Sequence, residues 1–291
     1  MAALQDRIAV ITGAGRGMGR EHALLFAAEG AKVVVNDTGG EADGTGHDAA
    51  VAVTVADEIR AAGGDAVASD HDVATMAGAE AAIGLAIDTW GRLDVLVNNA
   101  GILRDRMFVN MTEDEWDAVI RGHLRSHFCS TRTAAAHWRD RSKAGETVQG
   151  SVVNVSSTSG LRGAAGQSNY GAAKAGIAAL TVILAEELAR YGVRVNAIVP
   201  VARTRMTEEV AGIADMVRAP DDPAAFDVFH PGNVSPTVGW LATAACPVTG
   251  QVYLVRGGEI RRFDGWRDDR AVQQDARWSV DDVGAAVADL G

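Results

Sequence analysis

The stretch Thr12-Gly13-Ala14-Gly15-Arg16-Gly17-Met18-Gly19 decides the fold, because it joins an apolar run over 7–12 to a helical stretch over 18–29. Its glycines allow a tight turn and a close approach of the backbone to a pyrophosphate. The start of the helix adds unpaired N–H groups and the positive end of a dipole. A strand, a glycine turn and a helix in this order predict a phosphate-binding turn.

Further apolar runs follow this turn, and helical stretches separate most of them. We expect strands at 31–37, 66–69, 93–98, 152–156, 193–199 and 251–255, and helices at 48–62, 76–90, 112–141 and 169–191. Short apolar strands that alternate with helices are typical of βαβ units and of a parallel sheet buried on both faces. The sequence therefore predicts an α/β fold with a doubly wound parallel sheet of seven strands.

We expect a single domain over 1–258 and a C-terminal tail over 259–291, since no linker or internal repeat divides the chain. In the tail, Ser279-Val280-Asp281-Asp282 is typical of a capped helix start. A short amphipathic helix is expected there, with one apolar face formed by Val280, Val283, Val287 and Leu290. We expect this helix to pack on its own core or on a sister subunit, with contact at a substrate entrance as the alternative.

The composition excludes several classes of protein. The 291 residues carry a formal net charge of −11, which argues against nucleic acid and anionic membrane as partners. No apolar run approaches the ~20 residues that cross a bilayer, and the N-terminus does not look like a signal peptide. Cys129 and Cys246 are the only cysteines, too few for a disulfide framework or a zinc site. The sequence therefore favours the reducing cytoplasm.

Asp37 ends the second expected strand, 18 residues beyond Gly19. A carboxylate there accepts hydrogen bonds from the two hydroxyls of an adenosine ribose. It repels a 2′-phosphate by about 4 kcal/mol per unit charge at ~4 Å and an effective dielectric constant of about 20. Arg16 instead favours NADP, since a basic residue in the turn suits a 2′-phosphate. Because Asp37 stands where that phosphate would lie, the sequence favours NAD over NADP.

The segment Tyr170-Gly171-Ala172-Ala173-Lys174 places a phenol and an amine four residues apart on one helix face. A tyrosine has a pKa of about 10 and is a poor base at neutral pH. A nearby ammonium, together with a positive nicotinamide ring, favours the phenolate and brings the phenol toward useful acid/base strength. Ser157, 13 residues before Tyr170, adds a hydroxyl suited to holding a substrate oxygen.

The sequence resembles the classical short-chain dehydrogenases/reductases over about residues 5–258. The glycine turn at 12–19, Asn98-Asn99-Ala100-Gly101, Ser157 and the Tyr170–Lys174 pair carry this resemblance. It implies a seven-stranded Rossmann sheet and the transfer of a hydride and a proton. By the same resemblance, Tyr170 is the acid/base, Lys174 lowers the pKa of Tyr170 and binds the nicotinamide ribose, and Ser157 orients the substrate. The cofactor contacts that we predict, partly from the turn and partly from the resemblance, are Gly13, Arg16, Gly17, Met18, Gly19, Asp37, Asp72, Val73, Asn99, Ala100, Gly101, Tyr170, Lys174, Pro200 and Thr204.

A narrower resemblance is carried by the segments 33–40, 101–106 and 123–125. They are similar to the (3R)-hydroxyacyl-CoA dehydrogenase unit of peroxisomal multifunctional enzymes, also called the type 4 17β-hydroxysteroid dehydrogenase group. This resemblance implies an NAD-dependent oxidoreductase for a 3-hydroxyacyl-CoA type substrate. A hydroxysteroid or another bulky secondary alcohol is the alternative substrate. A non-catalytic dinucleotide-binding sensor is a third hypothesis.

Two positions depart from the family pattern. Most classical members carry Asn at the position of His123, where the backbone carbonyl holds a relay water, a role that a histidine backbone also serves. His123 and His127 are four residues apart like a metal pair, yet no third ligand is in reach, so no metal is expected. Pro200-Val201 replaces the usual Pro-Gly, and Thr204 is one residue off the commoner spacing, which leaves its carboxamide contact open.

The segment 204–233 is expected to form a substrate lid. Its apolar residues predict either a wall of the substrate site or simple lid packing: Met206, Val210, Met216, Phe226 and Phe229. Three arginines are candidates for a CoA phosphate or for a solvated face: Arg203, Arg205 and Arg218. Related enzymes pair the helices that correspond to 112–141 and to the Tyr170 helix, which implies a homo-dimer or homo-tetramer.

Overall fold

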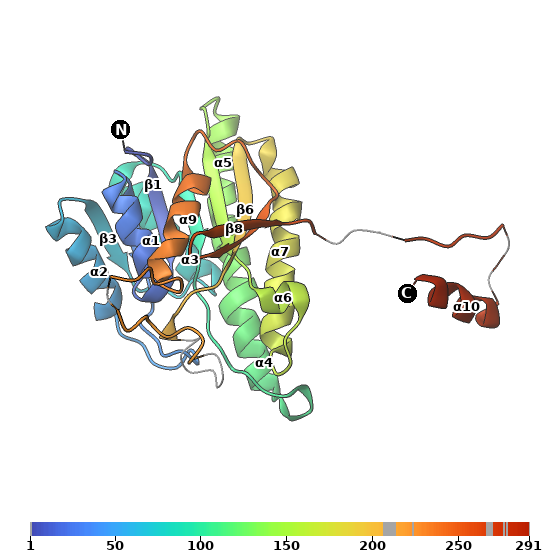
Figure 1. Cartoon of the computed structure of the whole chain (residues 1–291). Coiled ribbons are helices and arrows are strands. Elements are labelled where there is room, and N and C mark those ends of the chain that lie inside the picture. Colours follow the sequence, from blue (N-terminus) through green and yellow to red (C-terminus); the bar gives the residue numbers. More distant parts are fainter. Residues whose placement is uncertain are drawn as a thin grey trace.

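The computed structural model describes residues 2–205, 214–222, 224–265, 270–275, 277 and 279–290. Its centre is an eight-stranded sheet in the order β3-β2-β1-β4-β5-β6-β7-β8 (Figure 1). The strands are β1 (Ile8–Thr12), β2 (Lys32–Asn36), β3 (Asp65–Ser69), β4 (Val95–Asn98), β5 (Gly150–Val155), β6 (Val193–Pro200), β7 (Val252–Arg256) and β8 (Glu259–Phe263). Strands β1 to β7 are parallel, which confirms the predicted α/β Rossmann architecture.

The predicted number of seven strands is wrong, because β8 extends the sheet beyond residue 258. Gly257, with φ of +53°, and Gly258 form a two-residue turn between the paired residues Arg256 and Glu259. A two-glycine turn of this kind is typical of a β-hairpin, so β8 runs antiparallel to β7. The charged side chains of β8 suit an exposed sheet edge, and they hid the strand from a search for apolar runs.

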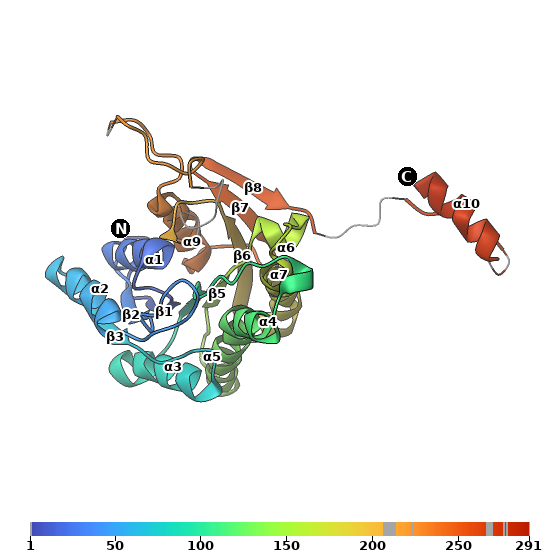
Figure 2. The same cartoon turned by 90° about the horizontal axis from the view of Figure 1, so that it is seen from below.

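Helices cover both faces of the sheet (Figure 2). On one face lie α1 (Gly17–Ala28), α2 (Ala50–Ala61) and α9 (Ser235–Ala242), which pack around Phe26 and Ile59. On the other face lie α3 (Met76–Trp90), α5 (Ser126–Lys143) and α7 (Ser168–Ala189), which pack around Trp138. The described chain also contains α4 (Glu113–Ile120), α6 (Thr158–Arg162), α10 (Val280–Leu290) and the 3₁₀ turns η1 (Phe108–Asn110) and η3 (Pro231–Val234).

The helix expected over 112–141 contains a π-helical turn, η2 (Arg121–Arg125), between α4 and α5. Its start is a capping box: the Thr112 hydroxyl accepts from the Glu115 N–H at 3.2 Å, and the Glu115 carboxylate accepts from the Thr112 N–H at 2.9 Å. A π-turn inserts one residue into the helical ladder and often marks a functional site. His123 lies in the middle of this turn and is buried.

The helix predicted in the tail is present as α10. The Ser279 hydroxyl accepts a hydrogen bond from the Asp282 N–H at 3.1 Å, as a helix cap does. Val280, Val283 and Val287 are exposed, and α10 lies apart from the sheet in Figures 1 and 2. The packing of its apolar face on another surface stays a prediction.

None of the helices in the described ranges is both long and apolar enough to span a lipid bilayer.

Candidate active site

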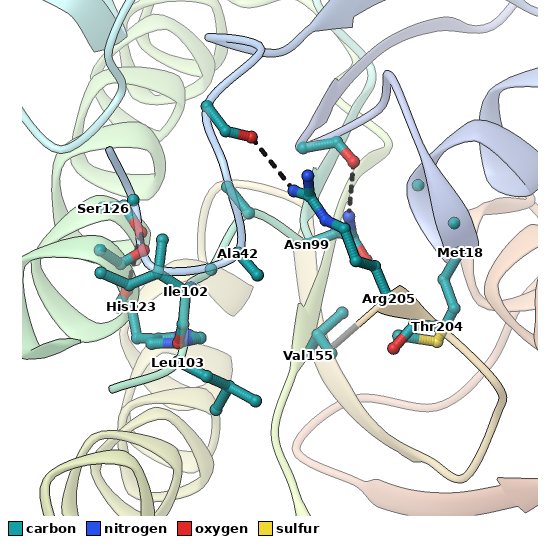
Figure 3. A pocket seen from close by; sticks show the side chains of 18 of the residues that line it. Met18, Ala42, Asn99, Ile102, Leu103, His123, Ser126, Val155, Thr204 and Arg205 are labelled. Atoms are coloured by element: carbon teal, nitrogen blue, oxygen red, sulfur yellow. Dashed lines mark hydrogen bonds between the residues drawn. The ribbon is translucent and has the colours of Figure 1, made fainter. Parts of the chain in front are cut away.

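The carboxyl ends of the parallel strands surround a pocket of about 690 Å³. It lies where the strand order reverses between β1 and β4, the position at which doubly wound sheets bind ligands. Every residue that the sequence predicted for catalysis or cofactor contact lines this pocket, from Gly13 to Thr204. Figure 3 labels four of them: Met18, Asn99, His123 and Thr204. The fold therefore gathers the whole predicted set in one place.

Asn99 ties the glycine turn to the end of β4. Its Nδ2 atom donates to the carbonyls of Thr12 at 3.0 Å and Gly13 at 2.9 Å, and its N–H donates to the Thr12 hydroxyl at 3.0 Å. Gly13 has φ of +63°, and a Cβ there would lie 2.8 Å from the Ala100 Cα. The turn therefore requires glycine, and its shape leaves the backbone at the start of α1 open to a pyrophosphate.

Asp37 joins the turn to the following loop, residues 38–46, here called the glycine loop. Its Oδ2 accepts from the Gly15 N–H at 2.8 Å, and its Oδ1 accepts from the Gly39 N–H at 2.7 Å. The guanidinium of Arg16 donates to the Gly40 carbonyl at 3.1 Å, so it folds against this loop. The carboxylate of Asp37 is thus fixed at the pocket wall, where an adenosine ribose is expected.

Asp72 and Thr204 are two more of the predicted cofactor contacts. Asp72 forms an ion pair with Arg121 and accepts from the Ala74 N–H at 2.9 Å, so its carboxylate has partners within the chain. Thr204 lies near the glycine turn, since a Cβ on Gly17 would be 3.7 Å from its methyl group (Figure 3). Both side chains line the pocket, and their contacts with a cofactor stay predictions.

Ser157 is held beside Tyr170 by the close packing of α6 on α7. Its hydroxyl caps α6 by accepting from the Ser159 N–H at 3.2 Å. A Cβ on Gly160 would lie 2.5 Å from the Ala175 nitrogen, so only glycine lets the two helices meet this closely. The Ser157 and Tyr170 side chains form a hydrogen bond that acts to lower the pKa of the phenol.

Burial shifts the pKa values of Tyr170 and Lys174 in opposite senses. It raises the pKa of Tyr170 to about 12, and the charge of Asp105 raises it further, against the hydrogen bond from Ser157. Burial lowers the pKa of Lys174 to about 7, although its Nζ donates to the Val155 carbonyl at 2.7 Å. Lys174 Nζ lies 5.5 Å from the centroid of the Tyr170 ring. The lowering of the Tyr170 pKa by Lys174, which the family resemblance implies, stays a prediction.

His123 lines the pocket, and its buried imidazole ring lies close to the Ile102 backbone. Its Nε2 lies 2.7 Å from the Ile102 carbonyl, and burial lowers its pKa well below the usual range, so the ring is neutral. Its backbone carbonyl accepts from the Ser126 hydroxyl and from His127 Nδ1, both at 2.8 Å. The carbonyl that the family resemblance assigns to a relay water thus already has two donors from the protein.

No group of three or more His, Cys, Asp or Glu side chains within the described residues gathers closely enough to hold a metal ion.

A series of side-chain hydrogen bonds near Ser157 was not predicted from the sequence. Gln167 donates to the Asp105 carboxylate at 2.6 Å, and the Ser159 hydroxyl donates to the Gln167 side-chain carbonyl at 2.6 Å. Burial raises the pKa of Asp105. The sequence carries no signal for these hydrogen bonds, because Asp105 and Gln167 are 62 residues apart and lie in loops.

Asn169, also missed, fixes the start of the Tyr170 helix. Its amide donates to the carbonyls of Arg104 at 2.9 Å and Glu115 at 3.1 Å, and its Oδ1 accepts from the Tyr170 N–H at 2.7 Å. It is fully buried, which is unusual for an asparagine without such partners. The sequence signal for this role was the position of Asn169, a polar residue directly before the expected acid/base Tyr170.

Only part of the segment 204–233, which is expected to form a lid, lies within the described residues. Met216 lines the pocket together with Val217, whereas Phe226 lies against Gly257 and Phe229 does not line the pocket. Met206 and Val210 fall outside the described residues. Two of the three arginines form ion pairs with residues of this segment: Arg203 pairs with Asp227 and donates to the Val217 carbonyl, and Arg218 pairs with Asp215.

Comparison with known proteins agrees with this geometry. The family model described as short chain dehydrogenase matches residues 7–212. The chain is 43% identical to a short-chain type dehydrogenase/reductase of Mycobacterium tuberculosis over 100% of its own length and 96% of the relative's. It is 48% identical to the hydroxyacyl-CoA dehydrogenase ChsB1 of the same organism, covering 88% of this chain and 79% of the relative.

Two further similarities extend this picture. Peroxisomal multifunctional enzyme type 2 of Mus musculus is 41% identical over 88% of this chain and 32% of its own length. The crystal structure of a short chain dehydrogenase from Mycobacterium avium superposes with a TM-score of 0.88 at 52% identity, covering 99% of this chain and 95% of that one. The chain therefore belongs to the short-chain dehydrogenase family and is an oxidoreductase.

Proposed function

We propose that the chain is an NAD-dependent dehydrogenase that interconverts a secondary alcohol and a ketone, with a 3-hydroxyacyl-CoA type compound as its substrate. The observation that carries this proposal is the convergence of Ser157, Tyr170 and Lys174 in the pocket that also contains the glycine turn. The substrate class is supported by the 48% identity with a protein named hydroxyacyl-CoA dehydrogenase.

The residues of the turn fit a nicotinamide dinucleotide. The backbone at Gly17 is open, since the nearest atom to a Cβ there would be 3.7 Å away, and the helix start lies directly behind it. Asp37 supplies a carboxylate for the ribose hydroxyls and supports NAD over NADP. When bound, the nicotinamide ring would accept or supply the hydride and, in its oxidised form, add a positive charge.

Ser157, Tyr170 and Lys174 have separate roles in the transfer of the proton. The Ser157 hydroxyl orients the substrate oxygen and stabilises charge on it. In reduction of a ketone, the Tyr170 phenol donates its proton to that oxygen, and in oxidation the same phenol oxygen accepts the proton of the alcohol. Because burial raises the pKa of Tyr170 to about 12, a positive charge nearby is needed to make the phenolate accessible. We expect ammonium Lys174 and the oxidised nicotinamide ring to supply this charge.

A steady-state screen tests the substrate class. Purified enzyme with NAD is assayed against 3-hydroxyacyl-CoA thioesters of increasing chain length and against hydroxysteroids. We expect kcat/KM to be highest for one range of acyl chain lengths. A preference for hydroxysteroids would instead support the alternative substrate, and no turnover of either class would support the sensor.

We further propose a homo-dimer or homo-tetramer that pairs α5 and α7 across subunits. These helices present Phe128, Val182 and Ile183 to solvent, and three large apolar side chains on neighbouring helices favour a buried contact. Light scattering on the purified protein tests this: Phe128→Glu with Ile183→Glu should lower the molar mass, and an unchanged mass would contradict the pairing.

A reducing compartment such as the cytoplasm is proposed for the chain. Cys129 and Cys246 are both free and buried, so neither contributes to a disulfide. Fractionation of cells that express the chain with an epitope tag tests the proposal.

A further inference from the structure

Arg205 connects the lid to the glycine loop across the pocket (Figure 3). Its Nη1 donates to the Glu41 carboxylate at 2.7 Å, and its Nη2 donates to the Gly40 carbonyl at 3.1 Å. Arg16, from the glycine turn, donates to the same Gly40 carbonyl at 3.1 Å. Two guanidinium groups therefore converge on a single backbone oxygen at the pocket rim.

A guanidinium group binds phosphate oxygens through two parallel N–H donors, so two guanidinium groups at one rim suit a phosphate dianion. At this rim a 2′-phosphate on the adenosine ribose would meet such a pair. Asp37, which is fixed to Gly15 and Gly39 on the same wall, opposes that phosphate by its charge. Glu41 acts in the same direction as Asp37, because its carboxylate occupies one of the donors of Arg205 and neutralises the charge of that arginine.

We propose that Glu41 is a second determinant of cofactor specificity. It holds Arg205 against the glycine loop and so denies a 2′-phosphate the second arginine of the pair. This inference rests on the proposed preference for NAD and deepens it, since it assigns the preference to Glu41 as well as to Asp37.

The test measures dissociation constants of NAD and NADP for the full chain by calorimetry. In Glu41→Gln, Arg205 keeps its place but no longer pairs with a carboxylate. We therefore expect the affinity for NADP to rise by about five- to tenfold, while the affinity for NAD changes less than about twofold. The size of the gain is modest because the pair is partly solvated, with side-chain exposures of 39% for Arg205 and 65% for Glu41. That exposure also makes a loss of folding unexpected.

Two controls separate this role from a general loss of negative charge. Asp43→Asn removes the same charge from the same loop, but the Asp43 carboxylate accepts from Thr45 rather than from an arginine. We expect this variant to bind both cofactors as the parent chain does. In the double variant Glu41→Gln with Arg205→Gln, the gain in NADP affinity should disappear.

The outcomes separate this inference from the proposed function. A parent chain that prefers NADP overturns both the proposed cofactor and the role of Glu41. A parent chain that prefers NAD, with a ratio unchanged in Glu41→Gln, overturns only the role of Glu41. An equal gain in Asp43→Asn, or a gain that survives the loss of Arg205, also overturns it.

Discussion

The imidazole ring of His123 stands edge-on to the phenol ring of Tyr170, with ring centroids 5.1 Å apart and planes at 83°. The ring reaches this position because the π-helical turn at 121–125 directs it inward and Gly101 leaves room for it. The position of the proposed acid/base thus depends on the packing of His123, although this residue is neutral and its backbone carbonyl is already bonded.

Gly101→Ala should disturb this pair. A Cβ on Gly101 would lie 2.0 Å from His123 Cε1, so the ring must move away. Overpacking of this kind costs about 1–3 kcal/mol of unfolding free energy. We expect a lower denaturant midpoint and a lower kcat, with the affinity for NAD less affected.

A double-mutant cycle provides the control. His123→Ala removes the atoms that the new methyl group meets, so Gly101→Ala should cost less stability in that background than in the parent chain. Equal costs in both backgrounds would show that the clash with His123 is not the cause.

Asp37 has two separable roles in the structure, one by charge and one by hydrogen bonding. Asp37→Asn removes the charge but keeps one oxygen acceptor, so it should raise the ratio of NADP to NAD affinity. Asp37→Ala also removes the acceptor for the Gly15 and Gly39 amides, and it should in addition weaken binding of both cofactors. Unchanged affinity ratios in both variants would remove Asp37 as a selector.

The pKa of Lys174 predicts a pH dependence of stability. Burial lowers this pKa from 10.5 to about 7, so between pH 7 and 10 the unfolded chain binds more protons at Lys174 than the folded chain does. Unfolding free energy therefore rises with pH in this window, by up to about 1.4 kcal/mol per pH unit for one group. Lys174→Met lacks this contribution.

Urea unfolding of both proteins at several pH values from 7 to 9.5 tests this prediction. The stability of the parent chain relative to Lys174→Met should increase as the pH rises. Parallel curves for the two proteins would mean that folding does not shift the pKa of Lys174.

The sheet was largely predictable because a parallel strand buried on both faces must be a short apolar run. Val33, Val34 and Val35 of β2 are fully buried and stood out for this reason. Strand β8 did not, because an edge strand with Arg261 and Arg262 carries no such signal. The π-turn was also hidden, since its residues continue the helical pattern and only tertiary packing of His123 distinguishes them.

The residues of the site were predictable where chemistry restricts the residue type, as at Ser157, Tyr170 and Lys174. Contacts between distant segments were not. The bond from Gln167 to Asp105 and the pair of Arg205 with Glu41 join residues 62 and 164 positions apart. Many polar residues in loops are equally plausible partners until the fold is known, so sequence spacing alone cannot select them.

The central claim is that Tyr170 exchanges the proton of the substrate, and the variant Tyr170→Phe tests it most directly. The measurement compares kcat with a 3-hydroxyacyl-CoA substrate and the dissociation constant of NAD in the parent chain and the variant. The account predicts a loss of kcat of about 10²–10⁴-fold, typical of a removed acid/base, with NAD binding retained. Turnover close to that of the parent chain would contradict it.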